Sequence, residues 1–239
     1  MTEEVHQTVG EHYHRDVQGG SARAAVFGVS DGLVSNVGLI LGVAGADPAP
    51  SIVRLAGLAG LIAGAISMAA GEYNSMRVQS ELLERELEIE RLEIRRNPEF
   101  ETAELAEVYE SRGMGADRAR EMAEAVMQDP EVALETHARE ELGVDPTQLG
   151  SPLGAATSSF TAFSIGALVP LVPWFLGSGT SAIAASLIAA VLAAMAVGVA
   201  IGRFTGKPLV RTLSRQVVFT LVPAALTFAV GSAVGVSGV

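Results

Sequence analysis

The fold of this chain follows from residues 64–97, which read GAISMAAGEYNSMRVQSELLERELEIERLEIRRN. The stretch begins like a membrane-spanning helix and ends like a charged soluble one. After Gly71 no proline or glycine interrupts it before the break at Asn97-Pro98. One helix is therefore expected from near Ile52 to residue 97, and at about 1.5 Å per residue it measures roughly 65 Å. Since that is about twice the hydrocarbon thickness of a bilayer, its second half should stand in water.

Five segments of the chain are apolar, near residues 22–46, 52–73, 154–176, 180–202 and 209–235. Each has the roughly 20 residues that a spanning helix needs. With 49% hydrophobic residues and a mean hydropathy of +0.37, the chain is too apolar for an ordinary soluble domain. We predict an all-α fold with five transmembrane helices per protomer and a small cytoplasmic helical domain inserted between helices 2 and 3.

The expected organisation has four parts. Residues 1–21 form an N-terminal cytoplasmic tail, 22–77 carry helices 1 and 2, 78–146 form the acidic helical domain, and 147–239 carry helices 3 to 5. Within the acidic domain, glycine and proline signals predict short helices near 99–112, 116–128 and 130–142. In helix 1, the glycines at 28, 32, 38 and 42 form two GxxxG pairs, which make this helix a candidate for a dimer contact.

Charge sets the expected orientation and excludes several functions. Nine arginines lie between Arg77 and Arg139, and further basic residues lie in the tail and in the fourth connection. The rule that basic residues are retained inside then places the N-terminus in the cytoplasm and the C-terminus outside. A net charge of −11 argues against nucleic acid as a partner. The absence of cysteine excludes disulfides and thiolate chemistry.

Many acids of the inserted domain have no basic partner on their own helix. Of 27 acidic residues, 21 lie between Glu72 and Asp145. Three carboxylates share one face of the long helix at i, i+4 and i+7, namely Glu86, Glu90 and Glu93. The next helix repeats an acid at every third position: Glu101, Glu104, Glu107 and Glu110. Like charges at such spacing destabilise a helix, and a cation bound between the helices would turn this into a binding site.

The last short helix adds an imidazole to these carboxylates. His137 lies three and four residues before Glu140 and Glu141, on one helical face. Carboxylate oxygens suit Mg²⁺, Ca²⁺ and Mn²⁺, and an imidazole shifts the preference toward Fe, Mn or Zn. The plainer alternative is a polar helical cap with solvated acids, so spacing alone predicts a metal site without choosing the metal.

Asp31 is the only acid of helix 1 and is expected about 14 Å deep. An ionisable group there costs on the order of 3 kcal/mol, which indicates an ion or proton site. On helix 2, Met68 and Glu72 lie four residues apart and share a face, and further polar oxygens come from Ser35, Ser67 and Asn74. In the plainer alternative Asp31 and Glu72 are wetted by headgroups and Met68 packs in the core.

Three strings resemble the vacuolar iron transporter family, including its bacterial and nodulin-like members. They read SDGLVSNVGLILGVAGA (30–46), GAISMAAGEYNSM (64–76) and THAREELG (136–143), and the similarity runs over essentially the whole chain from residue 23. The resemblance implies a homodimer of five-helix protomers. It also implies transport of Fe²⁺, often Mn²⁺ and sometimes other divalent ions such as Zn²⁺ or Co²⁺, out of the cytosol in exchange for protons.

By motif, the resemblance assigns Asp31 and Met68 to the translocation path, with Glu72 close by. It assigns Glu104 and Glu107 to an E-x-x-E of the metal-binding domain and Glu141 to the acid of its final helix.

The family has a second acidic pair, on the long helix. Glu90 and Glu93 have the right spacing for it, but a register shift would place Glu86 there instead. Plant members carry two adjacent methionines just before the final acid. This chain has His137-Ala138 there, so we expect an imidazole in place of sulfur, with Glu140 beside it.

The resulting hypothesis is a transporter, not an enzyme, with no tightly bound cofactor beyond the transported metal. The main alternative is a membrane-tethered carboxylate di-iron ferroxidase or oxidase, although such sites usually need two Glu-x-x-His motifs and this domain has one histidine. A third is a metal sensor or a structural anchor. Expected partners are divalent ions, protons, lipid and a second copy. Fifteen arginines against one lysine are typical of a GC-rich prokaryote, which favours the plasma (inner) membrane.

Overall fold

The computed structural model describes residues 20–146 and 150–236, and every regular element in them is a helix. In chain order the helices are α1 (Gly20–Gly45), α2 (Pro50–Arg96), α3 (Pro98–Ser111), α4 (Ala116–Val126), α5 (Pro130–Glu140), α6 (Pro152–Leu171), α7 (Pro173–Leu176), α8 (Gly179–Thr205) and α9 (Leu209–Val236). Five of them, one extended by α7, are long and apolar enough to cross a membrane. The predicted all-α multi-pass architecture is therefore confirmed. The tail predicted for residues 1–21 lies almost wholly outside the described residues.

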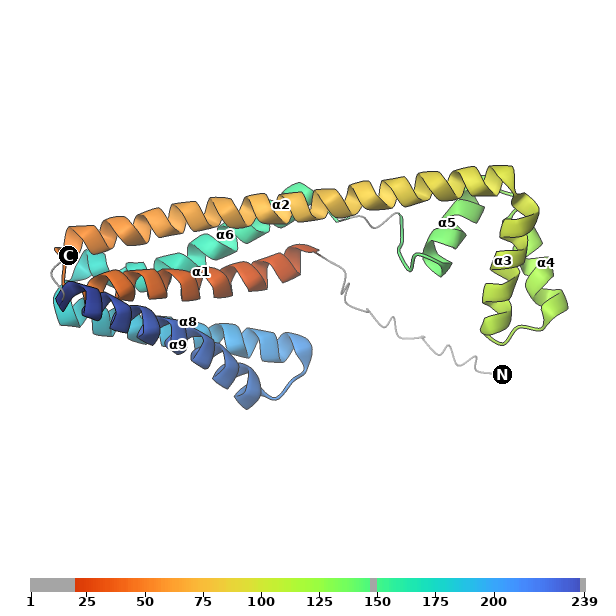
Figure 1. Ribbon diagram of the computed structural model, residues 1–239. Coiled ribbons are helices and arrows are strands. Elements are labelled where there is room, and N and C mark those ends of the chain that lie inside the picture. The colour runs from red at the N-terminus through yellow and green to blue at the C-terminus, as the bar shows by residue number, and fades with distance from the viewer. Residues whose placement is uncertain (1–19, 147–149, 237–239) are drawn as a thin grey trace, which may run out of the picture.

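Helix α2 is the longest helix that the structure describes and runs unbroken for 47 residues. Figure 1 shows it reaching from the far end of the membrane bundle to the helices α3–α5. From Ala65 onward its buried residues recur along one stripe, which includes Ala65 and Met76 and then Glu90 and Ile94. The same face of one helix therefore packs first against the bundle and then against the short helices, as the sequence predicts for an uninterrupted rod.

Helix α1 lies in the middle of the bundle, because its glycines let neighbouring backbones approach closely. A Cβ on Gly32 would collide with the backbone of Phe163 in α6. Further along α1, a Cβ on Gly42 would lie 3.1 Å from Thr227 Cβ in α9. The GxxxG glycines thus contact α6 and α9 within one protomer, and the expected dimer contact of this helix stays a prediction.

Prolines end or interrupt two of the spanning helices. Pro170 lies in the last turn of α6, and Pro173 begins the four-residue α7 after a break at Val172. Pro223 lies inside α9. A proline lacks the N–H that an interior helical position needs, so each of these positions is a local interruption of the hydrogen-bond ladder.

Residues 78–146, here called the acidic subdomain, comprise the second half of α2 together with α3, α4 and α5. A small core of Leu105, Ala106, Ala119 and Ala123 joins α3 to α4. Helix α5 packs on α2 through Ile94, Ala133 and Leu134. The subdomain is built from helices of 14 residues or fewer on an exposed helical arm, and these helices leave most of their charged surface in solvent.

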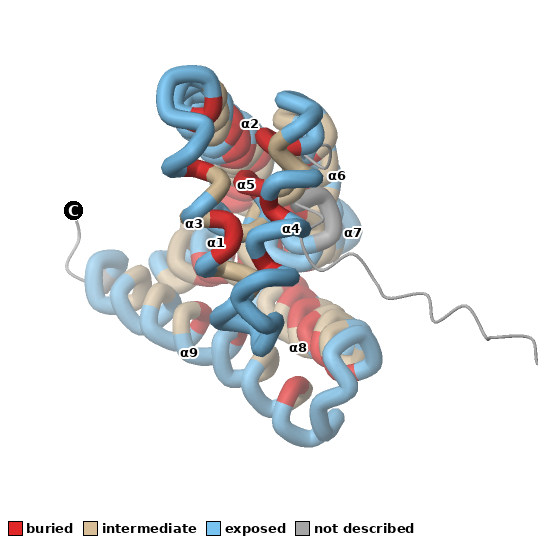
Figure 2. The backbone as a smooth tube through the Cα atoms, turned by 90° about the vertical axis from the view of Figure 1, so that its right-hand side faces the viewer, coloured by how far each residue is buried: buried red, intermediate tan, exposed pale blue. Residues whose placement is uncertain are grey.

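The outer surface of the bundle is apolar. Figure 2 shows buried residues where the helices face one another and exposed residues along the outer sides of α8 and α9. Large exposed side chains on α9 include Phe219, Val222, Leu226 and Val230. Such a surface suits lipid, not water. The start of α1 and the connection between α8 and α9 lie at the bundle end nearer the acidic subdomain (Figure 1).

Candidate functional site

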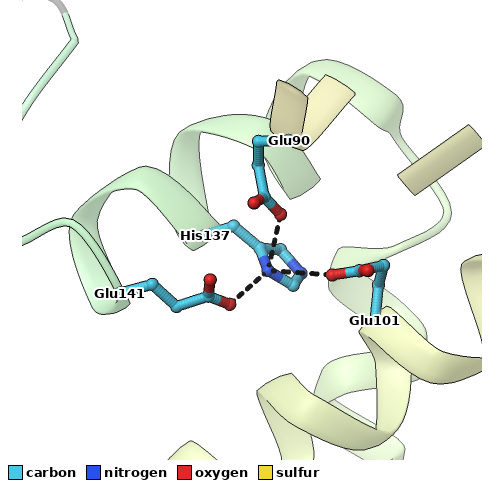
Figure 3. Close-up of side chains that lie close together, drawn as sticks. All are labelled: Glu90, Glu101, His137 and Glu141. Carbon is cyan, nitrogen blue, oxygen red and sulfur yellow. Dashed lines mark hydrogen bonds and ion pairs between the residues drawn. The ribbon is translucent and has the colours of Figure 1, made fainter. Parts of the chain in front are cut away.

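Four side chains from three helices converge inside the acidic subdomain (Figure 3). Glu90 comes from α2, Glu101 from α3, His137 from α5, and Glu141 from the residue that ends α5. His137 Nδ1 lies 2.7 Å from Glu141 Oε1, 3.1 Å from Glu90 Oε1 and 3.8 Å from Glu101 Oε2. One ligand atom from each residue lies within 4.8 Å of the others, so a single cation can reach all four. We call these residues the metal cluster.

Local sequence signals position the cluster. The break at Asn97 lets α3 begin at Pro98, where the missing N–H needs no helical partner, and Glu101 falls in its first turn. Asp129 caps α5 by accepting hydrogen bonds from the backbone N–H groups of residues 131 and 132. Two turns further on, His137 lies between the fully buried Ala133 and Ala138, whose small side chains let α5 approach α2 closely.

Burial and mutual repulsion dominate the electrostatics of the metal cluster. Burial, followed by the nearby carboxylate of Glu141, raises the pKa of Glu90 to about 7, and His137 partly opposes this. Burial also raises the pKa of Glu101, again against the effect of His137, with Glu104 and Glu93 adding repulsion. These groups lie on the arm beyond the apolar half of α2, outside the span. Carboxylates that repel one another in this way bind a proton or a cation more readily than isolated ones.

Some buried polar atoms of the metal cluster have no hydrogen-bond partner among the described residues. His137 is fully buried, and its Nδ1 carries at most one proton, which the shorter contact directs to Glu141. No described residue donates a hydrogen bond to the buried Glu90 Oε1, and none pairs with His137 Nε2. Three carboxylates and an imidazole fit a divalent transition metal such as Fe²⁺, Mn²⁺ or Zn²⁺. A bound cation would coordinate the carboxylate oxygens of the cluster and offset their mutual repulsion.

Of the residues selected from sequence, Glu90, His137 and Glu141 belong to the metal cluster. Glu101 is the member that the selection missed, although it belongs to the series of acids at every third position. Glu101 could have been identified from the apolar face of α3. Leu105 on that face is fully buried, and Glu101 lies four residues before it on the same face.

The remaining predicted ligands surround the cluster without joining it. Glu104 is half-buried, and the pKa of its carboxyl is raised by burial and then by Glu141, which places it beside the four. Glu93 and Glu86 are exposed. Glu107 is exposed too, and it lines an open groove of about 880 Å³ between α3 and α4. Glu140 forms an ion pair with Arg112 just after α3 and does not belong to the cluster.

Between α1 and α2, Asp31 and Met68 line one cavity of about 220 Å³, which opens at the outer face of the bundle, where Ser35 and Ser67 are exposed. Its wall contains the polar side chains of Ser35, Asn36 and Ser67 together with Leu39, Gly60, Gly64 and Phe163. Met68 also packs against the buried cluster around Phe163, so core packing and a place on the cavity wall are both realised. The two residues that the resemblance assigns to the path therefore share one space, here called the membrane cavity.

Glu72 lies near this cavity but not on its wall. Its buried carboxylate Oε2 accepts a hydrogen bond of 3.1 Å from Arg23 Nη2, which joins α2 to the start of α1. Asp31 borders a second, mostly apolar cavity of about 490 Å³ between α1 and α9. There, Gln216 donates a hydrogen bond of 2.9 Å to Ser30. Asp31 thus borders both cavities.

The fold and these two sites define a multi-pass membrane protein with candidate cation sites inside and outside the bilayer. Over residues 22–232 the chain matches the model of the VIT family. It is 32% identical over 218 residues to "Vacuolar iron transporter 2" of Oryza sativa subsp. japonica, which covers 90% of this chain and 89% of that protein. It is 31% identical over 231 residues to "Vacuolar iron transporter 1" of Arabidopsis thaliana, covering 95% and 92%. The chain belongs to the VIT family, and the resemblance drawn from its motifs is confirmed.

Proposed function

We propose that this protein transports divalent transition metals, Fe²⁺ and Mn²⁺ foremost, out of the cytosol in exchange for protons, and that it works as a homodimer. The observation that carries the proposal is the placement of two candidate cation sites along one helix. Glu90 of the metal cluster and Met68 of the membrane cavity both belong to α2, about 33 Å apart at 1.5 Å per residue. The two relatives reported above are named vacuolar iron transporters, which agrees with this class of cargo.

Each site has a distinct part in the proposed cycle. The acidic subdomain faces the cytoplasm and binds ions there, which raises their concentration near the entrance of the bundle. Asp31 then holds either a metal ion or a proton, because both compete for the same carboxylate oxygens. A proton arriving from outside displaces the ion outward and resets the site. The basic residues near the α8–α9 connection support this orientation, since such residues are enriched on the cytoplasmic side.

The imidazole of His137 adapts the metal cluster to iron and manganese. Carboxylates alone suit Mg²⁺ and Ca²⁺, and a nitrogen ligand moves the preference toward transition metals. The buried ring is held between Glu141 and Glu90, so a bound ion would meet an oriented nitrogen and three oxygens. Zn²⁺ and Co²⁺ are further candidates for the same donor set.

The proposal is tested in proteoliposomes with an imposed pH gradient. Wild-type protein should move Mn²⁺ and, under anaerobic conditions, Fe²⁺ only while the gradient persists. Asp31→Asn should abolish the flux and leave metal binding at the cluster intact. The matched control is Asp47→Asn, which removes an acid from the α1–α2 connection and should leave the flux unchanged. Wild-type vesicles without gradient-dependent flux would refute the transport proposal, and flux retained by Asp31→Asn would refute the path.

The ferroxidase alternative predicts a different result in the same preparation. Adding Fe²⁺ to the detergent-purified protein would then consume oxygen at a rate that depends on the metal cluster. Among the described residues this cluster contains a single histidine, and the relatives are named as transporters, so we expect no oxygen consumption above the protein-free control. Cross-linking in membranes tests the homodimer, and protease access to the acidic subdomain in intact cells tests its orientation.

A further inference from the structure

Asn36 is a buried amide in the middle of α1, with a relative exposure of 2%. Its Nδ2 donates a hydrogen bond of 2.6 Å to the backbone oxygen of Ala167 in α6. Because a carbonyl can only accept, this bond fixes which end of the amide is nitrogen and which is oxygen. The Oδ1 atom therefore points away from α6, and no described residue donates a hydrogen bond to it.

The free oxygen of Asn36 faces the second helix of the membrane cavity. A Cβ placed on Gly60 of α2 would lie only 2.9 Å from Asn36 Oδ1, so the glycine leaves room for this oxygen. Asn36 lines the same cavity as Asp31 and Met68. Leaving a buried acceptor without a donor costs about 1–3 kcal/mol, and such a group in a native structure calls for an explanation.

We infer that Asn36 Oδ1 is a ligand for the divalent ion in the membrane cavity and that it helps to select the ion. The inference rests on the proposed function, in which this cavity is the ion path. Along α1, Asn36 lies about 7.5 Å beyond Asp31, away from the acidic subdomain. Asn36 therefore extends the ion-binding wall outward from Asp31.

The chemistry of the wall defines the effect on selectivity. The amide oxygen of Asn36 and the carboxylate of Asp31 are hard donors that suit Mn²⁺, whereas the thioether of Met68 is soft and favours ions such as Zn²⁺. A neutral oxygen also adds coordination without adding charge. An ion held by one carboxylate and one amide is bound less tightly than by two carboxylates, and this favours release, which conduction requires.

The test compares two metals, because a ligand role for Asn36 should change the preference between Mn²⁺ and Zn²⁺, whereas a purely structural role should not. In proteoliposomes, the KM for Mn²⁺ transport and the inhibition constant of Zn²⁺ are measured for each variant. Asn36→Leu keeps the volume but removes the oxygen, so the KM for Mn²⁺ should rise about tenfold, the usual scale for losing a metal-supporting group. The inhibition constant of Zn²⁺ should change less than threefold. Met68→Leu should have the opposite effect and weaken Zn²⁺ inhibition more than Mn²⁺ transport.

Ser186→Ala is the matched control for helix packing. The buried Ser186 hydroxyl donates a hydrogen bond of 2.6 Å to the backbone oxygen of Pro170 in α6, but the residue does not line the membrane cavity. This variant should leave the ratio of the two constants at the wild-type value. If Asn36→Leu also leaves the ratio unchanged, the ligand role is overturned.

A second variant covers the case in which Asn36→Leu fails to fold. Asn36→Asp keeps an oxygen at the cavity and adds a charge, so it should lower the KM for Mn²⁺ and slow the maximal rate. Unchanged values of both constants would overturn the inference. If the wild-type protein moves no metal at all, it is the proposed function that fails, and the two failures are thereby distinguished.

Discussion

Arg23 Nη2, near the start of α1, lies 3.1 Å from Glu72 Oε2 on the buried face of α2. The side chain of Arg23 is 63% exposed and that of Glu72 is 9% exposed, so the arginine reaches from the surface to a buried carboxylate. Glu72 lies one turn from Met68 on the side of the acidic subdomain. The pair therefore joins the two helices of the membrane cavity at the end from which ions are proposed to arrive.

Removing the arginine should destabilise the bundle. Arg23→Gln leaves a buried carboxylate without its charged partner, which costs about 1–3 kcal/mol. We expect a lower midpoint of thermal unfolding in detergent and partial recovery in the double variant Arg23→Gln/Glu72→Gln. The control is Arg77→Gln, which breaks an exposed pair of 2.8 Å with Glu81 and should change stability by less than about 0.5 kcal/mol. Equal effects of the two single variants would contradict this account.

Metal binding at the cluster should depend on pH. The pKa of Glu90 is raised to about 7, so below pH 7 a bound proton must leave before the ion can use that oxygen. The affinity for Mn²⁺ should fall about tenfold per pH unit below pH 7 and level off above it. Isothermal titration calorimetry between pH 5.5 and 8 measures this, and a flat profile over that range would contradict it.

The same group makes the metal-free protein less stable at higher pH. The folded-state pKa of Glu90 lies above its ordinary value of 4.5, so protonation favours the folded state. This contribution is fully present below about pH 4.5 and is lost as the pH rises through 7. Between pH 6 and 8 the acidic subdomain should become easier to unfold, as followed by limited proteolysis, and saturating Mn²⁺ should reverse the change. Equal proteolysis at both pH values without metal would be evidence against it.

Substitutions of two glutamates on α3 test which residues bind the metal: the cluster seen in the structure contains Glu101, whereas the family motif assigns Glu107. Glu101→Gln removes a buried oxygen that lies 3.8 Å from His137 Nδ1, and we expect the affinity of the cluster for Mn²⁺ to fall at least tenfold. Glu107→Gln removes the same charge six residues later on an exposed position and should change the affinity less than threefold. Calorimetry on both variants decides, and a larger effect at residue 107 would favour the assignment made from the family motif.

A pair of glycine substitutions tests the close packing of α1. Gly32→Ala would drive a methyl group into the backbone of Phe163, and such overpacking costs about 1–3 kcal/mol. Gly71→Ala in α2 meets no described atom within 4 Å and should stabilise the helix by roughly 0.5–1 kcal/mol. Thermal unfolding in detergent should therefore shift in opposite directions. A shift in the same direction would show that the approach of α1 to α6 is less tight than described.

Much of the fold could be predicted from sequence because its signals are local. The absence of glycine and proline after Gly71 predicts the unbroken α2, and the Asn97-Pro98 step predicts its end, as observed at Arg96. The apolar lengths predict the five spans. The GxxxG glycines were harder to interpret, since the motif indicates close helix contact but does not identify the neighbour.

The candidate sites were less predictable because they depend on contacts distant in sequence. Because acids recur at every third position of α3, the sequence does not show which of them is buried. The packing of Leu105 places Glu101 on the buried face. Asn36 carries no charge and attracts no notice in the sequence. Its significance depends on the backbone of Ala167, 131 residues away, which fixes the orientation of the amide.

The length of α2 has a consequence for communication between the two ends of the molecule. At physiological ionic strength the Debye length is about 8 Å, so the roughly 33 Å between Glu90 and Met68 is about four screening lengths of water. Through the solvent around the exposed half of α2, the field of an ion held by the metal cluster is therefore strongly screened before it reaches the bundle. The single stiff helix that carries both sites is the direct physical connection between them.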